Sequence, residues 1–246
     1  MANRNIYFEK RGIYHILTRA VDKKKFFADE KDCLRFVFQM FAANLGMTVS
    51  NFLRQNVSNI GRNLLVGRED SFGQTKPSRV SLVHILSFVL VVDHYHLLLA
   101  LNEDDDGIPR YMQRLNTGFA MYFNLKKNRR GALFESRYKV VSIENERQLN
   151  TIIRYINITN PLDVCQPGWR ERGVEDRVAA WNFLNKYQFS SFPDIFGKRN
   201  SSILASRSVL DEYLGESIIK DRAGLKELAQ DYLWQKSNQL FINTLE

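Results

Sequence analysis

The most continuous apolar stretch of the chain covers residues 88–101, FVLVVDHYHLLLAL, and is interrupted by polar residues near its middle. A run this apolar and rich in β-branched residues is typical of strands buried against a core. Asp93 indicates a tight bend between two such strands. We therefore expect two antiparallel strands, over residues 82–92 and 94–101.

Two histidines stand two residues apart in the second of these strands. Side chains alternate along a strand, so His94 and His96 should project from one face and Tyr95 from the other. Two imidazoles on one face of a rigid strand can bind the same metal ion. The alternative is a pair of half-buried polar residues. Polar rings in an apolar strand cost free energy unless a partner satisfies them, which favours the metal site.

The pattern of apolar positions predicts the remaining elements of the core. Residues 12–20 alternate as a first strand, in which His15 is either a third ligand or a core group. Asp29 is a typical N-cap of a helix that should end at Gly46. The later elements are a helix over 108–127, a strand over 132–143 and a helix over 146–158, which Asn160-Pro161 should end.

This order of elements predicts an α+β fold. Strand, helix, strand, strand, helix and strand form a ferredoxin-like or RRM-like four-stranded antiparallel sheet with helices on one face. Residues 47–80 lack periodicity and read as a basic insertion. We expect a catalytic domain over 1–161. A helical, aromatic-rich C-terminal extension should follow over 162–246, where residues 162–198 pack on the core and two helices cover 210–219 and 225–233.

Basic residues are concentrated in one segment of the chain. The formal net charge is +8, and residues 107–139 contain eight Lys or Arg and one acid. These candidate nucleic-acid contacts are Arg110, Arg114, Lys126, Lys127, Arg129, Arg130, Arg137 and Lys139. Basic groups interleaved with aromatic rings favour binding of single-stranded nucleic acid. The alternative is an ordinary solvated face.

Composition indicates the class of protein and its cellular compartment. The hydrophobic content of 44% is that of a soluble globular protein, and no apolar run is long enough to span a membrane. Cys33 and Cys165 lack metal-ligand spacing, which indicates a reducing compartment. We expect a cytoplasmic, nucleoid-associated protein.

Four motifs resemble one known family, in the same order along the chain. VVDHYHLLLAL resembles the His-hydrophobic-His signature of the HUH single-strand DNA transposases. Tyr14-His15-Ile16 with Arg19 is similar to their first strand, residues 107–139 to their middle helix and following strand, and RYINITNP at 154–161 to their tyrosine helix. The resemblance covers about residues 6–198. It is closest to the REP-associated tyrosine transposases, relatives of the insertion sequence 200/605 transposases.

The resemblance implies a function and a set of site residues. Tyr155 would attack a phosphate of single-stranded or hairpin DNA, forming a 5′-phosphotyrosine. Mg²⁺ or Mn²⁺ would bind His94, His96 and an amide side chain one turn after the tyrosine. Thr159 occupies that position here, so we take Asn160 as the third ligand, with Asn157 as the other amide nearby.

Two further points stay open at the level of the sequence. Asp93 stands where relatives usually carry a Pro-Asn pair, and it either adds a carboxylate near the metal or caps the bend. Tyr122 is a rival nucleophile, although its place in an apolar helical stripe favours packing.

Three functions compete. The first is a tyrosine transposase, the second a catalytically silent DNA-binding module derived from one, and the third an RNA-binding protein on an RRM-like sheet. The sequence leaves open whether the protein is a monomer or a homodimer. It also leaves open whether the histidines and Tyr155 act within one chain.

Overall fold

A computed structural model describes residues 7–47, 56–68, 81–102 and 106–215. Four strands form one antiparallel sheet in the order β2-β3-β1-β4. Their bounds are β1 Ile13–Arg19, β2 Val83–Val91, β3 His94–Leu101 and β4 Lys139–Ile143. With the helices that connect β1 to β2 and β3 to β4, this order confirms the predicted ferredoxin-like α+β fold.

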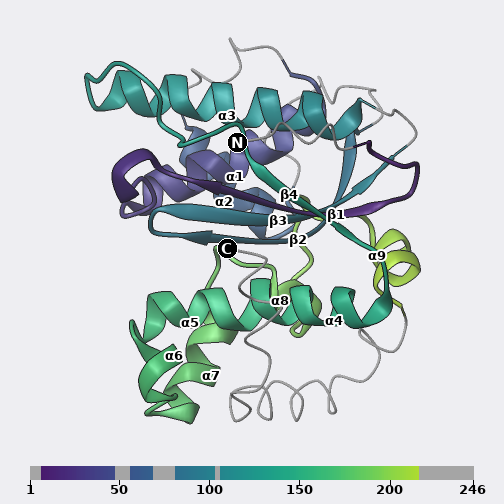
Figure 1. Cartoon of the computed structure of the whole chain (residues 1–246). Helices are drawn as coiled ribbons and strands as arrows, with labels where there is room; N and C mark the ends of the chain where they lie inside the picture. Colours follow the sequence, from purple (N-terminus) through teal and green to yellow (C-terminus); the bar gives the residue numbers. More distant parts are fainter. Residues whose placement is uncertain (1–6, 48–55, 69–80, 103–105, 216–246) are drawn as a thin grey trace.

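One face of the sheet is covered by three helices, as Figure 1 shows. They are α1 Glu30–Asn44, α2 Val57–Leu65 and α3 Gly107–Lys126. The predicted N-cap is confirmed, because the Asp29 side chain accepts a hydrogen bond from the Lys31 amide. Tyr95 of β3 lies on this face, with its ring 4.6 Å from that of Phe36 of α1.

Helix α2 corrects the interpretation of residues 47–80 as an irregular insertion. Val57, Ile60 and Leu64 recur at helical spacing and are buried. Gly61 allows α2 to approach α1 closely, since a Cβ atom there would lie 2.2 Å from the Leu34 carbonyl oxygen. The helix is short, so its periodicity is masked by the polar residues around it. Residues 48–55 and 69–80 lie outside the described residues.

The last strand is shorter than the predicted 132–143. β4 begins at Lys139, and before it the chain makes one isolated bridge, between Phe134 and Ala20. The hydrogen-bond ladder between β4 and β1 does not extend before Lys139, because β1 ends at Arg19 and is followed by η1, Val21–Lys23.

The second face of the sheet carries a long bent helical segment. It consists of α4 Glu146–Arg154, the π-helical turn η4 Tyr155–Thr159 and α5 Asn160–Cys165. The expected helix end at Asn160-Pro161 is therefore wrong. Proline lacks an N–H group, and here it follows a turn in which the helical hydrogen-bond register already shifts by one residue.

The C-terminal extension packs on this helical segment, as expected for 162–198. Its helices are α6 Trp169–Arg172, α7 Arg177–Lys186, α8 Phe192–Ile195 and α9 Arg207–Leu214. A second hydrophobic cluster joins the two parts, and its buried members are Ile158, Leu162, Ala180, Leu184 and Phe192. Helix α5 crosses residue 161, and the division of the chain into two domains there stays a prediction.

Two expected helices are tested only in part. α9 starts before the predicted 210–219 and ends at Leu214, while residues 225–233 lie outside the described residues. None of the helices within the described ranges is long and apolar enough to cross a membrane.

Candidate active site

The histidines lie on the sheet face that α4, η4 and α5 cover. In the register of β1 and β3, Leu17 pairs with His96 and Arg19 pairs with His94. Strand alternation therefore places His15, Arg19, His94 and His96 on one face, opposite to Tyr95. The ring centroids of His94 and His96 are 5.1 Å apart, and the rings are nearly perpendicular at 81°.

His96 is fully buried, and a neighbouring histidine sets the orientation of its ring. Its Nδ1 atom lies 2.8 Å from Nε2 of His15, and the two rings stack. Burial lowers the pKa of His96 well below its usual value and that of His15 to about 3, so both are neutral at neutral pH. Among the residues that the structure describes, the Nε2 atom of His96 has no hydrogen-bond partner. If Nδ1 of His96 donates its proton to His15, Nε2 keeps a free lone pair.

His94 is held by the acidic residue that precedes it. Its Nδ1 atom lies 2.7 Å from Oδ1 of Asp93, and the hydrogen bond lowers the pKa of that carboxyl group. A carboxylate that accepts the Nδ1 proton leaves Nε2 free as an acceptor, an arrangement typical of metal-binding histidines. Asp93 thus orients the His94 ring through a direct hydrogen bond.

Tyr155 lies against the two buried histidines. Its ring centroid is 5.3 Å from that of His96 and 6.3 Å from that of His15, with the rings close to perpendicular in both cases. The side chain is buried. The ring of Tyr155 thus meets His96 and His15 of its own chain.

The π-helical turn brings Asn160 to the position that an ordinary helix would give to Thr159. The backbone N–H of Asn160 donates to the carbonyl oxygen of Tyr155, five residues earlier, instead of four. The Nδ2 atom of Asn160 donates to the same carbonyl at 2.9 Å. Its Oδ1 atom is buried and has no hydrogen-bond partner within the described part of the chain. The extra residue of the π turn therefore explains why the amide stands at position 160, one residue after the position that α-helical spacing selects.

Asn157, the other candidate amide, has its side-chain atoms engaged in a closed ring of hydrogen bonds. Nδ2 of Asn157 donates to Ser87 Oγ at 2.9 Å, and Ser191 Oγ donates to Oδ1 of Asn157 at 2.7 Å. The two serine hydroxyls are 2.7 Å apart and complete the ring. Because both amide atoms are used, Asn157 is not available as a metal ligand.

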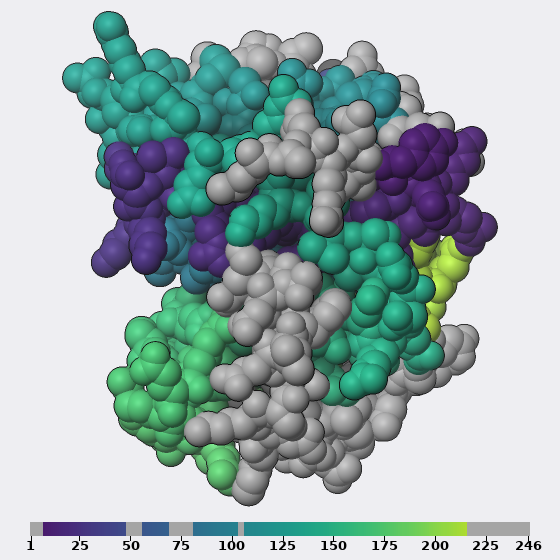
Figure 2. All heavy atoms as spheres, viewed as in Figure 1, coloured from purple at the N-terminus to yellow at the C-terminus, as the bar shows by residue number. Residues whose placement is uncertain are grey.

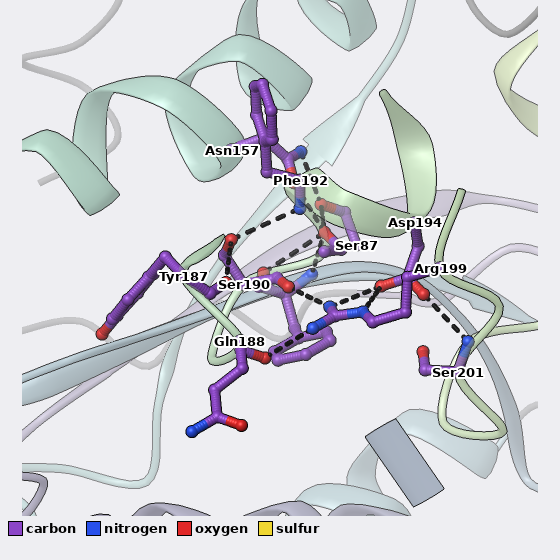
Figure 3. A network of polar contacts seen from close by, with 11 residues as sticks. Ser87, Asn157, Tyr187, Gln188, Ser190, Phe192, Asp194, Arg199 and Ser201 are labelled. Carbon is purple, nitrogen blue, oxygen red and sulfur yellow. Dashed lines mark hydrogen bonds and ion pairs between the residues drawn. The ribbon is translucent and has the colours of Figure 1, made fainter. Parts of the chain in front are cut away.

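A second set of polar contacts holds the segment that carries Ser191 (Figure 3). The Arg199 guanidinium donates to the Asp194 carboxylate and to the carbonyl oxygens of Gln188 and Ser190. Asp194 also accepts from the Ser201 amide at 2.9 Å. These contacts fix residues 188–201 against β2, and through Ser191 they fix the turn that carries Tyr155.

Asn157→Ala is expected to lower the free energy of unfolding by about 3 kcal/mol, because it removes the buried hydrogen bonds of Asn157 to Ser87 Oγ, Ser191 Oγ and the Ile153 carbonyl. Denaturant unfolding followed by circular dichroism measures the change. Asn185→Ala is the matched control, since this exposed amide bonds the Trp181 carbonyl alone and should cost about 0.5 kcal/mol or less. Equal losses in the two variants would contradict the role given to the ring.

The residues present fit a divalent cation, which the resemblance implies. His96 Nε2 and Asn160 Oδ1 are buried acceptors without partners, and His94 Nε2 is free of the Asp93 contact. Imidazole nitrogen is a general ligand of divalent first-row ions, and the amide oxygen, with water or phosphate oxygens, supplies the oxygen donors that Mn²⁺ or Mg²⁺ prefers. In the part of the chain that is described, no group of three or more His, Cys, Asp or Glu side chains could hold a metal. The cation would thus depend on two histidines, one amide and its substrate.

Two arginines near the site were not among the candidates from the sequence. Arg170 of α6 hydrogen-bonds with Tyr155, and its Cζ atom lies 5.6 Å from the centre of that ring. Arg19 is half-buried and pairs with His94 in the register, and its charge contributes to lowering the pKa of His96. The alternation of side chains along β1 could have identified Arg19, because it lies on the same face of the strand as His15. No signal in the sequence identifies Arg170, since tertiary packing brings it to the site.

Lys139 lies on the sheet face of this site, because it pairs with Leu17, which in turn pairs with His96. The other seven predicted nucleic-acid contacts precede β4 in the chain. Helix α3 and the chain up to β4 carry them, and α3 covers the opposite face of the sheet from α4 and α5 (Figure 1). In the space-filling view α3 and the α6–α7 region form opposite ends of the visible face (Figure 2). The structure thus brings together His94, His96 and Tyr155, with Asn160 hydrogen-bonded to the Tyr155 carbonyl, and places the cations of α3 on the other side of the sheet.

The environments of these cations differ. Lys126 forms ion pairs with Asp32 at 2.6 Å and Asp29 at 3.0 Å, and Arg129 donates to Asn124 and to the Ala132 carbonyl. Both side chains therefore stabilise the fold at the end of α3. Arg114 and Arg129 are half-buried, and the exposed members of the set are Arg110, Lys126, Lys127, Arg130, Arg137 and Lys139.

The rival nucleophile Tyr122 lies on α3, away from the histidines. Its hydroxyl donates to Oδ1 of Asp32 at 2.7 Å, and Arg35 lies over its ring. Burial and the neighbouring Asp32 raise the pKa of Tyr122 to about 12, which makes its oxygen a poorer nucleophile at neutral pH. This arrangement favours a packing role.

Comparisons with known proteins agree with this geometry. Residues 78–159 match the family model described as transposase IS200 like. A solved structure of a REP-associated tyrosine transposase bound to a REP hairpin is 16% identical in sequence and superposes with a TM-score of 0.50. The match covers 84% of this chain and 92% of that one, and at this identity it shows a shared fold. No curated protein matches the chain.

The matched residues 78–159 include both histidines of β3 and Tyr155, the groups that the fold brings together on one sheet face. This segment therefore carries the sequence pattern of the IS200-like transposases, and the resemblance identified from the motifs is confirmed.

Proposed function

We propose that this protein is an HUH-type tyrosine transposase that nicks and rejoins single-stranded or hairpin DNA through a 5′-phosphotyrosine. The observation that carries the proposal is the contact of Tyr155 with His96, at a ring separation of 5.3 Å, beside two unpartnered buried acceptors. A buried tyrosine beside acceptors suited to a cation is the arrangement needed for attack on a polarised phosphate. Such a protein would act in the cytoplasm, at the nucleoid.

The residues of the chain have separate tasks in this chemistry. His94, His96 and Asn160 would hold a divalent cation, which when bound supplies polarisation of a non-bridging oxygen of the scissile phosphate. Asp93 and His15 fix the ring orientations of the two histidines. Helix α4 and the π turn hold the tyrosine hydroxyl in a defined position, which lowers the entropic cost of attack.

The reaction itself exchanges one phosphoester bond for another. The Tyr155 oxygen forms a bond to phosphorus as the bond from phosphorus to the DNA 3′-oxygen breaks. The phenol releases its proton to solvent, and the 3′-oxygen takes up a proton. Because the number of phosphoester bonds is unchanged, the reverse attack by a 3′-hydroxyl of another strand can rejoin the DNA without a nucleotide cofactor.

The silent DNA-binding module is the alternative function. Its support in the sequence was the replacement of the expected amide by Thr159. The π turn weakens this support, because Asn160 occupies the corresponding position with a free Oδ1. An RNA-binding function would use the same surfaces, and competition between DNA and RNA hairpins of matched sequence would separate it from both.

The test of the proposal uses labelled hairpin DNA from the flanks of the protein's own gene. The full-length protein is incubated with this DNA and Mn²⁺ or Mg²⁺, and the products are run on a denaturing gel. We expect a covalent protein–DNA band that requires the cation and disappears with a chelator. Binding without such a band, with either ion, would favour the silent module.

A mixture of two inactive variants should stay inactive. His96→Ala lacks one metal ligand and Tyr155→Phe lacks the nucleophile, so a site formed within one chain cannot be restored by mixing them. The measurement is the yield of covalent adduct from the equimolar mixture, compared with each variant alone. Recovery of a substantial fraction of wild-type yield would show that the residues act between subunits.

DNA affinity should depend steeply on salt. If five or six phosphates are contacted, log K should fall with a slope of about −4 against log salt for single-stranded DNA. Replacing the exposed Arg130 and Arg137 together by Gln should make this slope shallower by about 1.4. Lys186→Gln, an exposed cation on α7, is the control. A flat salt response of the wild-type protein would refute the proposed basic surface.

A further inference from the structure

Arg170 is held in place before it reaches Tyr155. Its Nε and Nη2 atoms donate to the two oxygens of the Asp163 carboxylate at 3.0 and 2.6 Å. The same carboxylate accepts from the indole Nε1 of Trp169 at 2.8 Å. Asp163 belongs to α5, which continues directly from the turn that carries Tyr155. The guanidinium is therefore fixed relative to the tyrosine by a short and rigid path.

The bidentate contact leaves guanidinium donors for another acceptor. Arginine carries five N–H donors in a planar fork, and the Asp163 carboxylate takes two of them. The Cζ atom lies 5.6 Å from the centre of the Tyr155 ring, and the Arg170 side chain is about one-third exposed (32%). The phenol oxygen is rigidly attached to its ring, so a hydrogen bond from this fork to that oxygen holds the whole Tyr155 side chain in one position and orients its O–H group.

We propose that Arg170, fixed by Asp163, is a positioning residue that holds the Tyr155 hydroxyl for attack, so that the C-terminal extension completes the active site. This inference rests on the proposed function, since it assigns a partner to the proposed nucleophile. It goes beyond that function because α6 lies outside the residues that the family model matches. A held hydroxyl should raise the rate of the chemical step and leave the affinity for DNA unchanged.

The first test does not require DNA cleavage. The protein is labelled with carbon-13 at the ring carbon that bears the tyrosine hydroxyl, and the signal of Tyr155 is identified by its absence in Tyr155→Phe. Arg170→Met should move this signal, Arg170→Lys should move it less, and Arg172→Met should leave it in place. Arg172 is the matched control because it lies on the same short helix and contacts Glu175 and the Pro167 carbonyl.

An unmoved Tyr155 signal in Arg170→Met would overturn the inference. If Arg170→Met unfolds, as judged by the loss of separate signals from the other tyrosines, Asp163→Asn is the variant that tests the inference. It keeps Arg170 but weakens the contact that fixes it, so the Tyr155 signal should move partway. An unmoved Tyr155 signal in Asp163→Asn would also contradict the inference.

The second test separates this inference from the proposed function. In single-turnover reactions at saturating DNA, Arg170→Met should form the adduct about 100-fold more slowly with unchanged DNA affinity, and Arg170→Lys should recover part of the rate. Arg172→Met should react at the wild-type rate. A wild-type rate in Arg170→Met would overturn the inference. If the wild-type protein itself forms no adduct, the proposed function fails, and the Tyr155 signal still decides whether Arg170 positions the ring.

Discussion

Tyr155→Phe is expected to abolish the covalent protein–DNA adduct, with a loss of at least about 10⁴-fold in the rate of its formation. The substitution removes the attacking oxygen, and no other group can replace it at the same place. The ring and its contacts with His96 and His15 remain, so the fold should be preserved. DNA affinity, measured by gel shift without a divalent cation, should be close to that of the wild type.

Tyr122→Phe is the matched control for this prediction. It removes a hydroxyl of the same kind that donates to Asp32 on the opposite side of the sheet. Adduct formation should persist in this variant, with some loss of stability because the Asp32 carboxylate loses one hydrogen bond while it keeps its ion pair with Lys126. An adduct that survives Tyr155→Phe and disappears in Tyr122→Phe would reassign the nucleophile.

His96→Ala should eliminate cation-dependent cleavage. It removes the buried Nε2 atom, which has no partner among the described residues and is the strongest candidate to bind a cation. We expect adduct formation to fall by at least about 10³-fold, since the phosphate would no longer be polarised. Loss of Mn²⁺ binding, measured by electron paramagnetic resonance of the free ion, should accompany it.

The control for this substitution must separate ligand loss from disturbance of the core. His15→Phe removes the hydrogen bond to Nδ1 of His96 but leaves the proposed ligands in place. It should weaken Mn²⁺ binding by about 10- to 100-fold without abolishing it. Mn²⁺ binding that is unchanged in His96→Ala would exclude the histidine as a ligand.

The sheet and the histidine pair could be predicted from the sequence because both depend on strand alternation. An apolar run broken at Asp93 defines a hairpin, and a period of two places His94 and His96 on one face. Helix α2 was missed because its apolar positions span less than three turns within a polar segment. The length of β4 was overestimated because its partner β1 ends at Arg19. The residues of 132–143 carry no signal of where that partner strand ends.

The rest of the site depends on features that have no local pattern. A π turn changes the register of a helix by one residue, so spacing rules for an α-helix select Thr159 where the structure brings Asn160. The free Oδ1 of Asn160 and the engaged amide of Asn157 differ through tertiary partners. Arg170 reaches Tyr155 because Asp163 and Trp169 fix α6 against α5, which is a property of packing.

The assignment of the nucleophile is the central claim, and mapping the covalent bond tests it most directly. Trypsin cleavage after Arg154 and Arg170 releases residues 155–170, a peptide with a single tyrosine, and cleavage after Arg114 and Lys126 releases residues 115–126, also with a single tyrosine. After reaction with hairpin DNA and Mn²⁺ and digestion with nuclease, we predict a nucleotide mass on the peptide 155–170, at Tyr155. The same mass on residues 115–126, or on neither peptide while the DNA is bound, would contradict the account.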